Sequence, residues 1–386
     1  MKKLFYIGII GLTLFEILKV YFIMPFPGSQ RMNSVDFAYF LHTYRWHFRI
    51  ILTTLAFAGS LKAFQAEKKW WPAITSAVCL FIIYNFNFKM TADHMFLEPA
   101  NLVFKPQSEN ELGDTSLVLS VKIANEVKAY PIQFIAYHHK VQDTIGSQPV
   151  LVTYCNVCRT GRAFEPYVNG EFERFRLVGM DHFNAMIEDS RTGSWWRQAN
   201  GEAITGELKG TTLEEIESTQ MTVGKLFELY PQAQVMQADA DFMDSYDSLA
   251  RFERGKSESD LTRTDTLSWQ DKSWVVGVDV GGKAKAYDWN TLKENGLIKD
   301  TFANKSLLVV LSSDGQSFGV FESGGAEPAR VSNDTIYLDS KAFDLSGRSL
   351  ADSIPDLKRV PAYQEFWHSW RTFHPQTERM QPIPKG

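Results

Sequence analysis

A chain of 386 residues is too long for a single hydrophobic core of ordinary size, so we expect at least two compact parts. The net charge of −5 and the lack of a lysine- and arginine-rich run argue against the basic surface of a nucleic-acid-binding protein. A hydrophobic content of 44% and an aromatic content of 13% exclude a disordered chain and favour aromatic-rich β packing.

Three apolar segments near the N-terminus predict a membrane anchor. Segment 4–24 is about 21 residues long, which as a helix crosses the hydrocarbon core of a bilayer. No small-x-small cleavage site follows it, so we favour retention over removal as a signal peptide. Segments 50–66 and 72–88 are the second and third predicted spans. Residues 1–90 are therefore expected to form an anchor of three transmembrane helices.

Lysines predict how this anchor is oriented. They lie before the first segment and around the turn between the second and third segments: Lys2, Lys3, Lys62, Lys68 and Lys69. Cytoplasmic loops are enriched in such residues, so the chain from residue 89 onward is expected outside the cytoplasm. Three arginines of the first loop oppose this orientation: Arg31, Arg45 and Arg49. We predict a protein of the bacterial cytoplasmic (inner) membrane with a periplasmic C-terminal domain.

Two charged residues lie inside the first apolar segment. Glu16 and Lys19 are three positions apart, which places them on one face of a helix. An unpaired charge at the bilayer centre costs about 3 kcal/mol, so we predict that the two pair. A path for ions or protons is the alternative.

From residue 116 the chain changes to short β-branched and aromatic runs separated by Gly-Ser, Asn-Gly and Thr-Gly turns. This pattern is typical of β-sheet with hairpins. The best helix signals are 223–230 and 362–373, each followed by a proline. The exported part is therefore expected to be mainly β with minor α.

This exported part contains an internal repeat. Residues 118–165 align without a gap on residues 275–322 at an offset of 157, and about 11 of 48 positions are identical. The later parts of the two copies correspond more loosely. We predict two duplicated lobes, with boundaries as follows: linker 91–115, first lobe 116–238, connector 239–273 and second lobe 274–382.

The first lobe carries two of the three cysteines, Cys155 and Cys158, at the end of an apolar run. The second lobe has Ser312 and Gly315 at the aligned positions, so the fold does not require cysteines at this turn. Outside the cytoplasm such a pair is a disulfide, a thiol redox couple or half of a metal site. The third cysteine, Cys79, is expected to be a small residue buried in the membrane.

Each of the three interpretations of the cysteine pair has its own requirement. A disulfide across a loop this short removes only about 2 kcal/mol of unfolded-state entropy, which makes it a weak staple. A redox couple needs a stabilised thiolate, and Arg159 and Arg162 are the cations nearest in sequence. A metal site needs two further ligands.

His138 is the likeliest third ligand, because a hairpin turning at Gly146 brings it towards the cysteines. Further possible ligands are His139, Met180 and His182. Thiolate, imidazole and thioether together favour copper, whereas thiolate with imidazole alone favours zinc or iron. Covalent c-type haem is excluded by this motif, because arginine follows the second cysteine.

A second motif, DSRTGSWW, covers residues 189–196. One interpretation is an Asx-type turn capped by Asp189, with the tryptophans packed in the core. The alternative is a pocket wall in which Asp189, Arg191 and Trp196 contact a ligand. No hydrolase elbow, phosphate-binding loop, zinc-protease motif or dinucleotide fingerprint occurs.

These motifs are similar to those of the domain of unknown function 3179 family of bacterial and archaeal proteins, over about residues 92–375. The positions that match family motifs are Tyr130, Pro131, His138, Asp143, Tyr154, Cys155, Cys158, Asp189, Thr192, Gly193, Ser194, Trp196, Gly201 and Gly206. The chain departs from the family pattern at His139, Gln142 and Asn156, where the family has Glu, Asn and often Pro. The resemblance implies a domain identity and no established activity, substrate or cofactor.

The sequence thus predicts an integral membrane protein whose exported domain uses Cys155 and Cys158 for soft-metal binding or thiol redox chemistry. One alternative is a scaffold or ligand-binding module with a structural disulfide. A further alternative is an enzyme that uses Asp189 and His138 as acid and base. The membrane is the one predicted partner.

Overall fold

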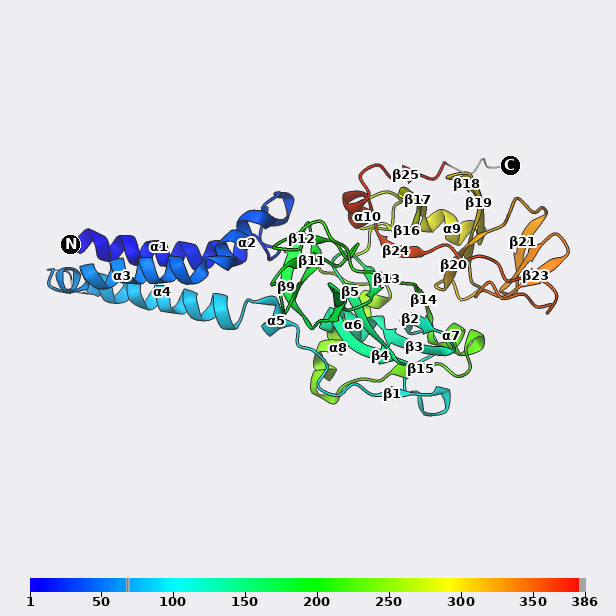
Figure 1. Ribbon diagram of the computed structural model, residues 1–386, viewed down its shortest axis with the longest axis horizontal. Helices are drawn as coiled ribbons and strands as arrows, with labels where there is room; N and C mark the ends of the chain where they lie inside the picture. The colour runs from blue at the N-terminus through cyan, green and yellow to red at the C-terminus, as the bar shows by residue number, and fades with distance from the viewer. Residues whose placement is uncertain (67, 69, 382–386) are drawn as a thin grey trace. The chain divides into compact units, whose positions relative to one another are not determined.

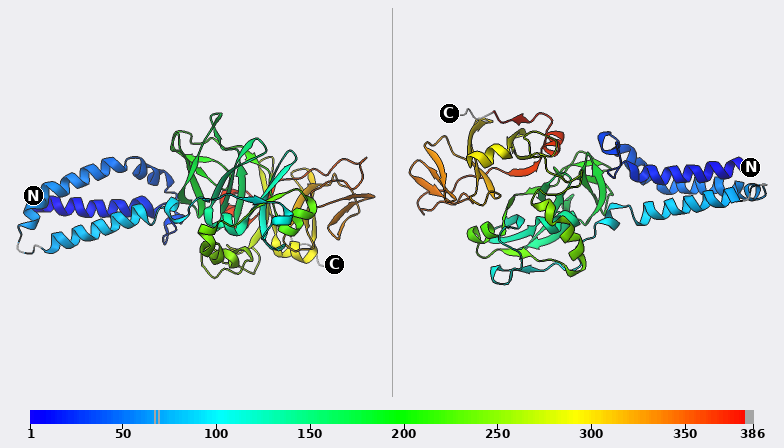
Figure 2. Two further views of the ribbon diagram at one scale, coloured as in Figure 1. Left: turned by 90° about the horizontal axis from the view of Figure 1, so that it is seen from below. Right: turned by 180° about the vertical axis from the view of Figure 1, so that it is seen from behind.

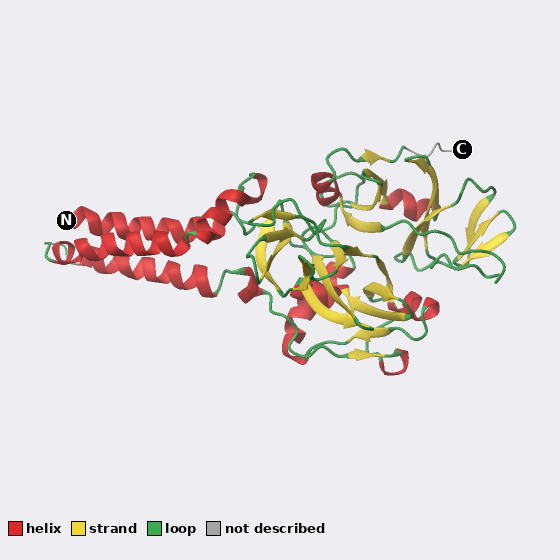
Figure 3. Cartoon of the chain, in the orientation of Figure 1, coloured by secondary structure: helices red, strands yellow, loops and turns green. Residues whose placement is uncertain are grey.

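The computed structural model describes residues 1–66, 68 and 70–381, in two compact units (Figures 1 and 3). Unit 1 consists of Met1–Leu97, Glu173–Arg197 and Gly201–Thr212, and unit 2 consists of Glu98–Phe172, Gln198–Asn200 and the chain from Leu213. The chain therefore leaves unit 2 after Phe172, touches it again at Gln198–Asn200 and returns to it at Leu213. Glu67 and Lys69, in the turn between the second and third predicted spans, and Pro382, at the end of the predicted second lobe, lie outside the described residues.

Helices form the larger part of unit 1. They are α1 (Lys2–Tyr21), α2 (Val35–Thr43), α3 (Arg45–Phe64), α4 (Trp70–Phe88) and α5 (Ala92–Met95). The long helices α1, α3 and α4 lie side by side (Figures 1 and 2). Contacts of Asn87 with Glu16 and of Phe64 with Phe5 show that α4 runs in the same direction as α1, and α3 in the opposite one.

Within the described residues, two helices, α1 and α4, are long and apolar enough to cross a membrane. The prediction of three such helices is therefore wrong. The second predicted span, 50–66, falls on α3, which also contains Arg45, Arg49 and Lys62. These charges, together with the threonines and small residues between them, leave α3 less apolar than the other two.

Small residues bring α1 and α3 together at close range. A Cβ atom added at Gly59 would lie 2.2 Å from the backbone nitrogen of Phe5, and one added at Gly8 would lie 2.4 Å from that of Ala56. Backbone approach of this kind through small residues is characteristic of helices packed in membranes.

The predicted pair of Glu16 and Lys19 forms, with a distance of 3.2 Å between Oε2 and Nζ. Arg49 of α3 adds two hydrogen bonds to the same carboxylate, at 2.6 and 3.0 Å, and Asn87 of α4 donates to it at 2.9 Å. One fully buried carboxylate therefore joins the three long helices.

A four-stranded sheet completes unit 1. In spatial order its strands are β12 (Ala203–Thr205), β11 (Trp195–Arg197), β10 (Asn184–Asp189) and β9 (Phe175–Asp181). The amide of Met180 donates to the carbonyl of Ile23 at 2.7 Å, and the amide of Phe183 donates to the side chain of Gln30. The sheet is thus tied to the segment that follows α1.

Unit 2 contains two similar sets of elements. The first half has β1 (Phe104–Lys105), β2 (Leu117–Ile123), β3 (Glu126–Pro131), α6 (Ile132–His138), β4 (Lys140–Ile145), β5 (Gln148–Cys155), β6 (Thr160–Phe164), β7 (Tyr167–Val168), β8 (Glu171–Phe172), β13 (Glu215–Ile216), β14 (Ser218–Thr222), α7 (Val223–Leu229) and β15 (Gln234–Met236). Its sheets have the strand orders β1-β15-β3-β2-β14, β13-β6-β5-β4 and β7-β8.

The second half has β16 (Trp274–Val280), β17 (Lys283–Asp288), α9 (Trp289–Asn295), β18 (Leu297–Phe302), β19 (Lys305–Leu311), β20 (Phe318–Glu322), β21 (Ala329–Ser332), β22 (Thr335–Leu338), β23 (Lys341–Phe343), β24 (Ala362–Phe366), α10 (Trp367–Phe373) and β25 (Glu378–Arg379). Its sheets have the orders β24-β16-β17-β25, β18-β19-β20 and β21-β22-β23. One apolar core includes side chains from both halves.

Strand registers in the two halves correspond at the offset of 157. Val118 pairs with Pro131 in the first half, and Val275 pairs with Asp288 in the second. The same offset relates β4–β5 to β18–β19 and α6 to α9. After the divergent middle segments, β14, α7 and β15 correspond to β24, α10 and β25 at an offset of 144.

A matching polar contact accompanies these registers. The hydroxyl of Tyr130 donates to Asp143 at 2.9 Å, and that of Tyr287 donates to Asp300 at 2.8 Å. Each tyrosine is the penultimate residue of its strand, β3 or β17, and each aspartate lies on the next strand, β4 or β18. The two halves therefore repeat a side-chain interaction as well as a backbone pattern.

Two element predictions need correction. One of the β-branched and aromatic runs that predict strands, 128–134, is a strand only as far as Pro131, and α6 begins at Ile132. The predicted helix 362–373 is a strand over its first five residues, because Ala362–Phe366 pairs along the open edge of β16. The part of the chain predicted as a charged connector contains α8 (Met243–Glu253), whose Tyr246 and Phe252 are buried in the core of unit 2.

Candidate functional site

The cysteine pair lies in the tight turn between β5 and β6. Cys155 is the last residue of β5 and pairs with Thr160 of β6, so Cys158 is in the turn itself. The two cysteines lie 3.9 Å apart and both are fully buried. All cysteines in the described part of the chain are thiols and not disulfides.

Residues from the far end of the chain surround this turn. The backbone amide of Phe366 donates to the carbonyl of Cys158 at 3.0 Å. The ammonium of Lys272 donates to the carbonyls of Val157 and Leu261, both at 2.6 Å, and lies 3.1 Å from Nε2 of His368. The connector and the start of α10 therefore enclose the cysteine turn.

Burial dominates the electrostatics of the pair. It raises the pKa of the Cys158 thiol well above the usual range, and the neighbouring Cys155 adds to this effect. A hydrogen bond from Ser369 and the positive charge of Lys272 act in the opposite direction. At neutral pH the Cys158 thiol is therefore protonated, and the ammonium of Lys272 is the cation that can stabilise its thiolate.

The two basic neighbours of the pair have low pKa values. Burial, followed by repulsion from Lys272, lowers the pKa of His368 to about 3, so its imidazole is neutral. Burial also lowers the pKa of Lys272, although the charges that Cys158 and Cys155 acquire on ionisation would raise it. Lys272 is therefore the group that places positive charge beside the thiols, and His368 adds none.

Arg159 and Arg162, the cations predicted to stabilise a thiolate, are engaged with strand β24. Arg159 donates to Gln364 at 3.0 Å and stacks 3.8 Å from the ring centroid of Trp274. Arg162 forms a buried ion pair with Glu365 at 2.5 Å. These contacts tie the first half of unit 2 to the second half, and Lys272 is the cation that acts on Cys158.

The predicted histidines are hydrogen bonded near the base of the hairpin. Nε2 of His138 lies 2.6 Å from the hydroxyl of Tyr246 on α8. His139 ends α6 in the left-handed conformation, with φ of 60°, and its Nδ1 lies 2.8 Å from the carbonyl oxygen of Tyr154. Burial lowers the pKa of His139 to about 4.

A metal site was one of the three predicted roles of the cysteine pair. In the parts of the chain that are described, no three His, Cys, Asp or Glu side chains group as a metal site would require. The predicted set of Cys155, Cys158 and His138 is thus not assembled as such a group. Met180 and His182 belong to unit 1, where Nδ1 of His182 lies 2.7 Å from Asp181.

Asp189 organises its own turn in unit 1. Its carboxylate accepts hydrogen bonds from the amide and hydroxyl of Thr192 at 2.6 and 2.8 Å, from the amide of Ser194 and from the indole of Trp196 at 2.9 Å. Gly206 is needed opposite this turn, because a Cβ there would lie 2.6 Å from Oγ of Ser194. These contacts give the Asp, Thr, Ser and Trp residues of the motif a structural role in forming the turn, without a ligand.

The other predicted ligand contacts of this motif are also paired. Nε of Arg191 lies 2.6 Å from Glu173, and the indole ring of Trp196 is buried. Ligand binding by Asp189, Arg191 and Trp196 stays a prediction, as does acid–base catalysis by Asp189 and His138.

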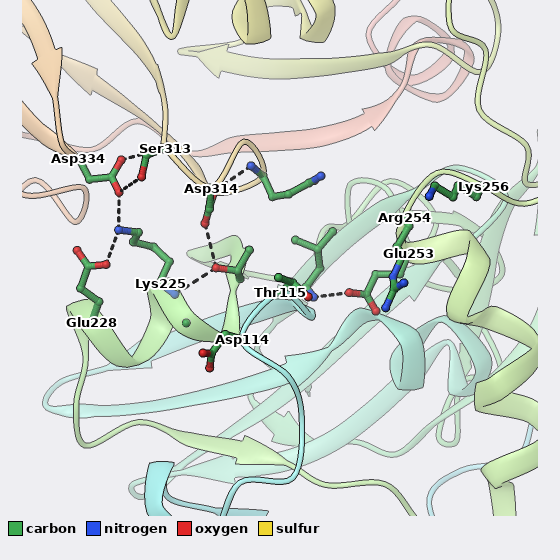
Figure 4. A pocket seen from close by; sticks show the side chains of 14 residues that line it. Asp114, Thr115, Lys225, Glu228, Glu253, Arg254, Lys256, Ser313, Asp314 and Asp334 are labelled. Atoms are coloured by element: carbon green, nitrogen blue, oxygen red, sulfur yellow. Dashed lines mark hydrogen bonds and ion pairs between the residues drawn. The ribbon is translucent and has the colours of Figure 1, made fainter.

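Unit 2 also contains a pocket of about 710 Å³ at the turn between β19 and β20 (Figure 4). Lys225 bridges Asp334, at 2.6 Å, and Glu228, at 2.5 Å, on one side of it. Arg254 and Lys256 line the opposite side. Sequence reasoning missed this pocket, because its residues come from five separate parts of the chain.

The pocket and the cysteine turn occupy corresponding places in the two halves. In the first half the β5–β6 turn meets the start of α10, and in the second half the β19–β20 turn meets the start of α7. There the hydroxyl of Thr222 donates to Asp314 at 2.9 Å, and the backbone amide of Thr222 donates to Oγ of Ser317, also at 2.9 Å. One position in this arrangement thus holds buried thiols and the other an open polar pocket.

Sequence reasoning also missed Lys272, His368 and Ser369. The loose correspondence between the later parts of the two copies relates α10 to α7. It was the one sequence signal for these residues, and it does not indicate which turn α10 contacts. Only the pairing of β24 with β16 brings these residues to the cysteines.

The fold and the site together define a mainly β protein with N-terminal helices and a buried cysteine pair. A family model described as protein of unknown function (DUF3179) matches residues 99–377, and the chain belongs to this family. Comparison with curated proteins found no match, and comparison with solved structures also found none.

Proposed function

We propose that this chain is a membrane-anchored protein whose exported, β-rich part carries a thiol–disulfide couple formed by Cys155 and Cys158. The apolar helices α1 and α4 support the anchor, as do the large apolar side chains that α1, α3 and α4 expose. Lys2 and Lys3 before α1 favour a cytoplasmic N-terminus. The oxidising conditions outside the cytoplasm suit a disulfide couple.

One observation carries the redox proposal: two adjacent buried thiols lie beside the ammonium of Lys272, which donates to the carbonyl of Val157 in the same turn. A positive charge favours the thiolate, which is the reactive form of cysteine. The aligned turn in the second half has serine and glycine instead, and it folds into the same hairpin. Reactivity therefore explains the cysteines better than a structural need does.

The proposed reaction is thiol–disulfide exchange with a small-molecule disulfide. Cys158 loses its proton, and the thiolate attacks one sulfur of that disulfide and expels the other as a thiolate. Cys155 then displaces the remaining thiol, so the pair loses two protons and two electrons and the small disulfide becomes two thiols. Because both thiols are buried, exchange requires the turn to separate transiently from α10.

A relationship between the two halves of unit 2 by duplication is part of this proposal. The matched registers and the repeated tyrosine–aspartate contact support it. After such a duplication, one copy would have kept or gained the thiols while the other acquired a polar pocket.

The test uses full-length protein in detergent with Cys79→Ser, which leaves two thiols. The protein is equilibrated with mixtures of reduced and oxidised dithiothreitol, alkylated, and analysed by mass spectrometry. We expect reversible oxidation of both cysteines with a single midpoint, and slower exchange in Lys272→Met, because the thiolate loses its cation.

Two results would overturn the redox proposal. A pair that stays reduced under all mixtures would show that it is not a couple. An oxidised pair that can be reduced only after unfolding would identify it as a structural disulfide in a scaffold.

A second function, ligand binding, is favoured by the charged pocket at the β19–β20 turn. Its lining combines three basic side chains, Lys225, Arg254 and Lys256, with several carboxylates, which suits a small zwitterion. Amino acids are suitable probes. A rise in thermal midpoint that is lost in Arg254→Gln would support this function, and no rise with any amino acid would reject it.

A further inference from the structure

A second cavity, of about 370 Å³, lies within unit 1 where the long helices meet the sheet. Its lining includes Lys19 at the end of α1, Arg45 and Arg49 on α3, and Arg176 on β9. Its acidic lining residues are Asp93 and Glu188. Neither the family nor the cysteine chemistry accounts for this concentration of basic groups.

Part of this positive charge is neutralised within unit 1. Lys19 and Arg49 share the buried carboxylate of Glu16. Arg176 pairs with Glu188 at 2.7 Å and with Asp93 at 3.1 Å. These pairs hold the two walls of the cavity in place.

Arg45 is the exception. Its Nη1 donates to the backbone carbonyl of His42 at 2.7 Å, and within the described residues no carboxylate lies at ion-pair distance from its guanidinium. Burial, followed by repulsion from Arg45 and Arg176, lowers the pKa of His42 to about 3, so this imidazole is neutral. The cavity therefore presents one guanidinium with unused donors beside a neutral imidazole, and Glu188, the carboxylate whose charge acts on Arg45, is already paired with Arg176.

The position of the cavity along the helices indicates which anion it takes. Lys19, Val20 and Asn87 lie in the last turns of α1 and α4, the two helices that are apolar enough to span a membrane. Past those ends, Ile23 and Val178 add an apolar side to the lining. In a bilayer this is the depth at which hydrocarbon gives way to phosphate headgroups.

We propose that this cavity binds the phosphate of an anionic membrane lipid, with Arg45 as the principal phosphate ligand. Guanidinium groups bind phosphate oxygens through paired, charge-assisted hydrogen bonds. The apolar side of the cavity contacts the glycerol and the first acyl carbons. This inference rests on the proposed membrane anchor and is independent of the thiol couple.

The test compares lipids on the full-length protein purified in detergent. Native mass spectrometry measures retention of phosphatidylglycerol and of phosphatidylcholine, and thermal midpoints are measured with each lipid and with inorganic phosphate. We expect phosphatidylglycerol to be retained and stabilising, with roughly tenfold weaker retention in Arg45→Gln and partial recovery in Arg45→Lys. Arg31→Gln, an exposed arginine outside the cavity, is the matched control.

Other results would overturn the proposal. Equal retention of both lipids, or equal losses in Arg45→Gln and Arg31→Gln, would remove the site. Stabilisation by inorganic phosphate without lipid retention would identify a site for free phosphate. Failure of the anchor itself would be distinct, because the protein would then leave membranes without detergent.

Discussion

Three buried tyrosines of unit 2 differ in whether the hydroxyl group has a hydrogen-bond partner. The hydroxyl groups of Tyr130 and Tyr287 each donate to an aspartate in corresponding places. The hydroxyl of Tyr154, one position before the first cysteine, is buried and has no hydrogen-bond partner among the described residues. Burial raises the pKa of Tyr154, so this hydroxyl stays protonated.

Three phenylalanine substitutions test this difference. Tyr130→Phe and Tyr287→Phe should each lower the free energy of unfolding by about 1–3 kcal/mol, because a half-buried carboxylate loses a donor. Tyr154→Phe should be neutral or stabilising, because no hydrogen bond is lost. Chemical denaturation measures all three, and a loss in Tyr154→Phe equal to that in Tyr130→Phe would contradict this account.

His139 makes the stability of unit 2 depend on pH. Its folded-state pKa is about 4, against about 6.5 for an unperturbed histidine. Between these values the unfolded chain binds more protons than the folded chain, so stability falls as pH falls. The contribution of this residue is about 1.4 kcal/mol per pH unit.

His139→Asn should reduce this slope between pH 6.5 and 4.5. Asparagine also accepts the left-handed conformation in which His139 ends α6, so the backbone is preserved. Denaturation at several pH values gives the slope, and an unchanged slope in the variant would show that other groups cause it.

At the scale of elements, the contact between α1 and α3 depends on the absence of a side chain at Gly59. Gly59→Val would place carbon atoms against the backbone of Phe5, so we expect a loss of about 1–3 kcal/mol. Ala58→Val is the control, because Ala58 is exposed on the same helix. Thermal unfolding in detergent measures both, and equal stability of the two variants would argue against tight α1–α3 packing.

A strand that leads directly into a helix, as β24 leads into α10, occurs several times in unit 2. β3 leads directly into α6, β14 into α7 and β17 into α9. Each junction places a helix start beside a strand end, where backbone amides and side chains of the helix can reach a neighbouring turn. At β24 and α10 this is how Phe366 and Ser369 come to the cysteines.

At the scale of the whole molecule, the sheet β9–β12 belongs with the helices of unit 1. A chain that begins at Glu98 lacks Ile23 and Gln30, which bond to this sheet, and Tyr39, whose ring packs 5.1 Å from that of Trp195. We expect β9–β12 to lose protection in such a chain while β16–β20 keep theirs. Hydrogen exchange measures this, and full protection of both sheets would show that β9–β12 folds without the helices.

Sequence patterns among neighbouring residues predicted much of this architecture correctly. The apolar runs at 4–24 and 72–88 identify α1 and α4, and the alternating runs identify most strands of the β-rich part. The repeat at offset 157 anticipated the matching registers. The second span, 50–66, was wrongly predicted because a window of apolar residues in α3 concealed the charges at the two ends of this helix.

The sequence alone determined the class of the protein: N-terminal helices, a mainly β remainder, the family, and a cysteine pair at a turn. These follow from segment length, alternation and motif identity, which depend on neighbouring residues. Only the tertiary structure decided that Lys272 and His368 surround the pair and that Arg45 faces a cavity. Such contacts join positions far apart in the chain, and packing between strands and helices sets them, which no local pattern encodes.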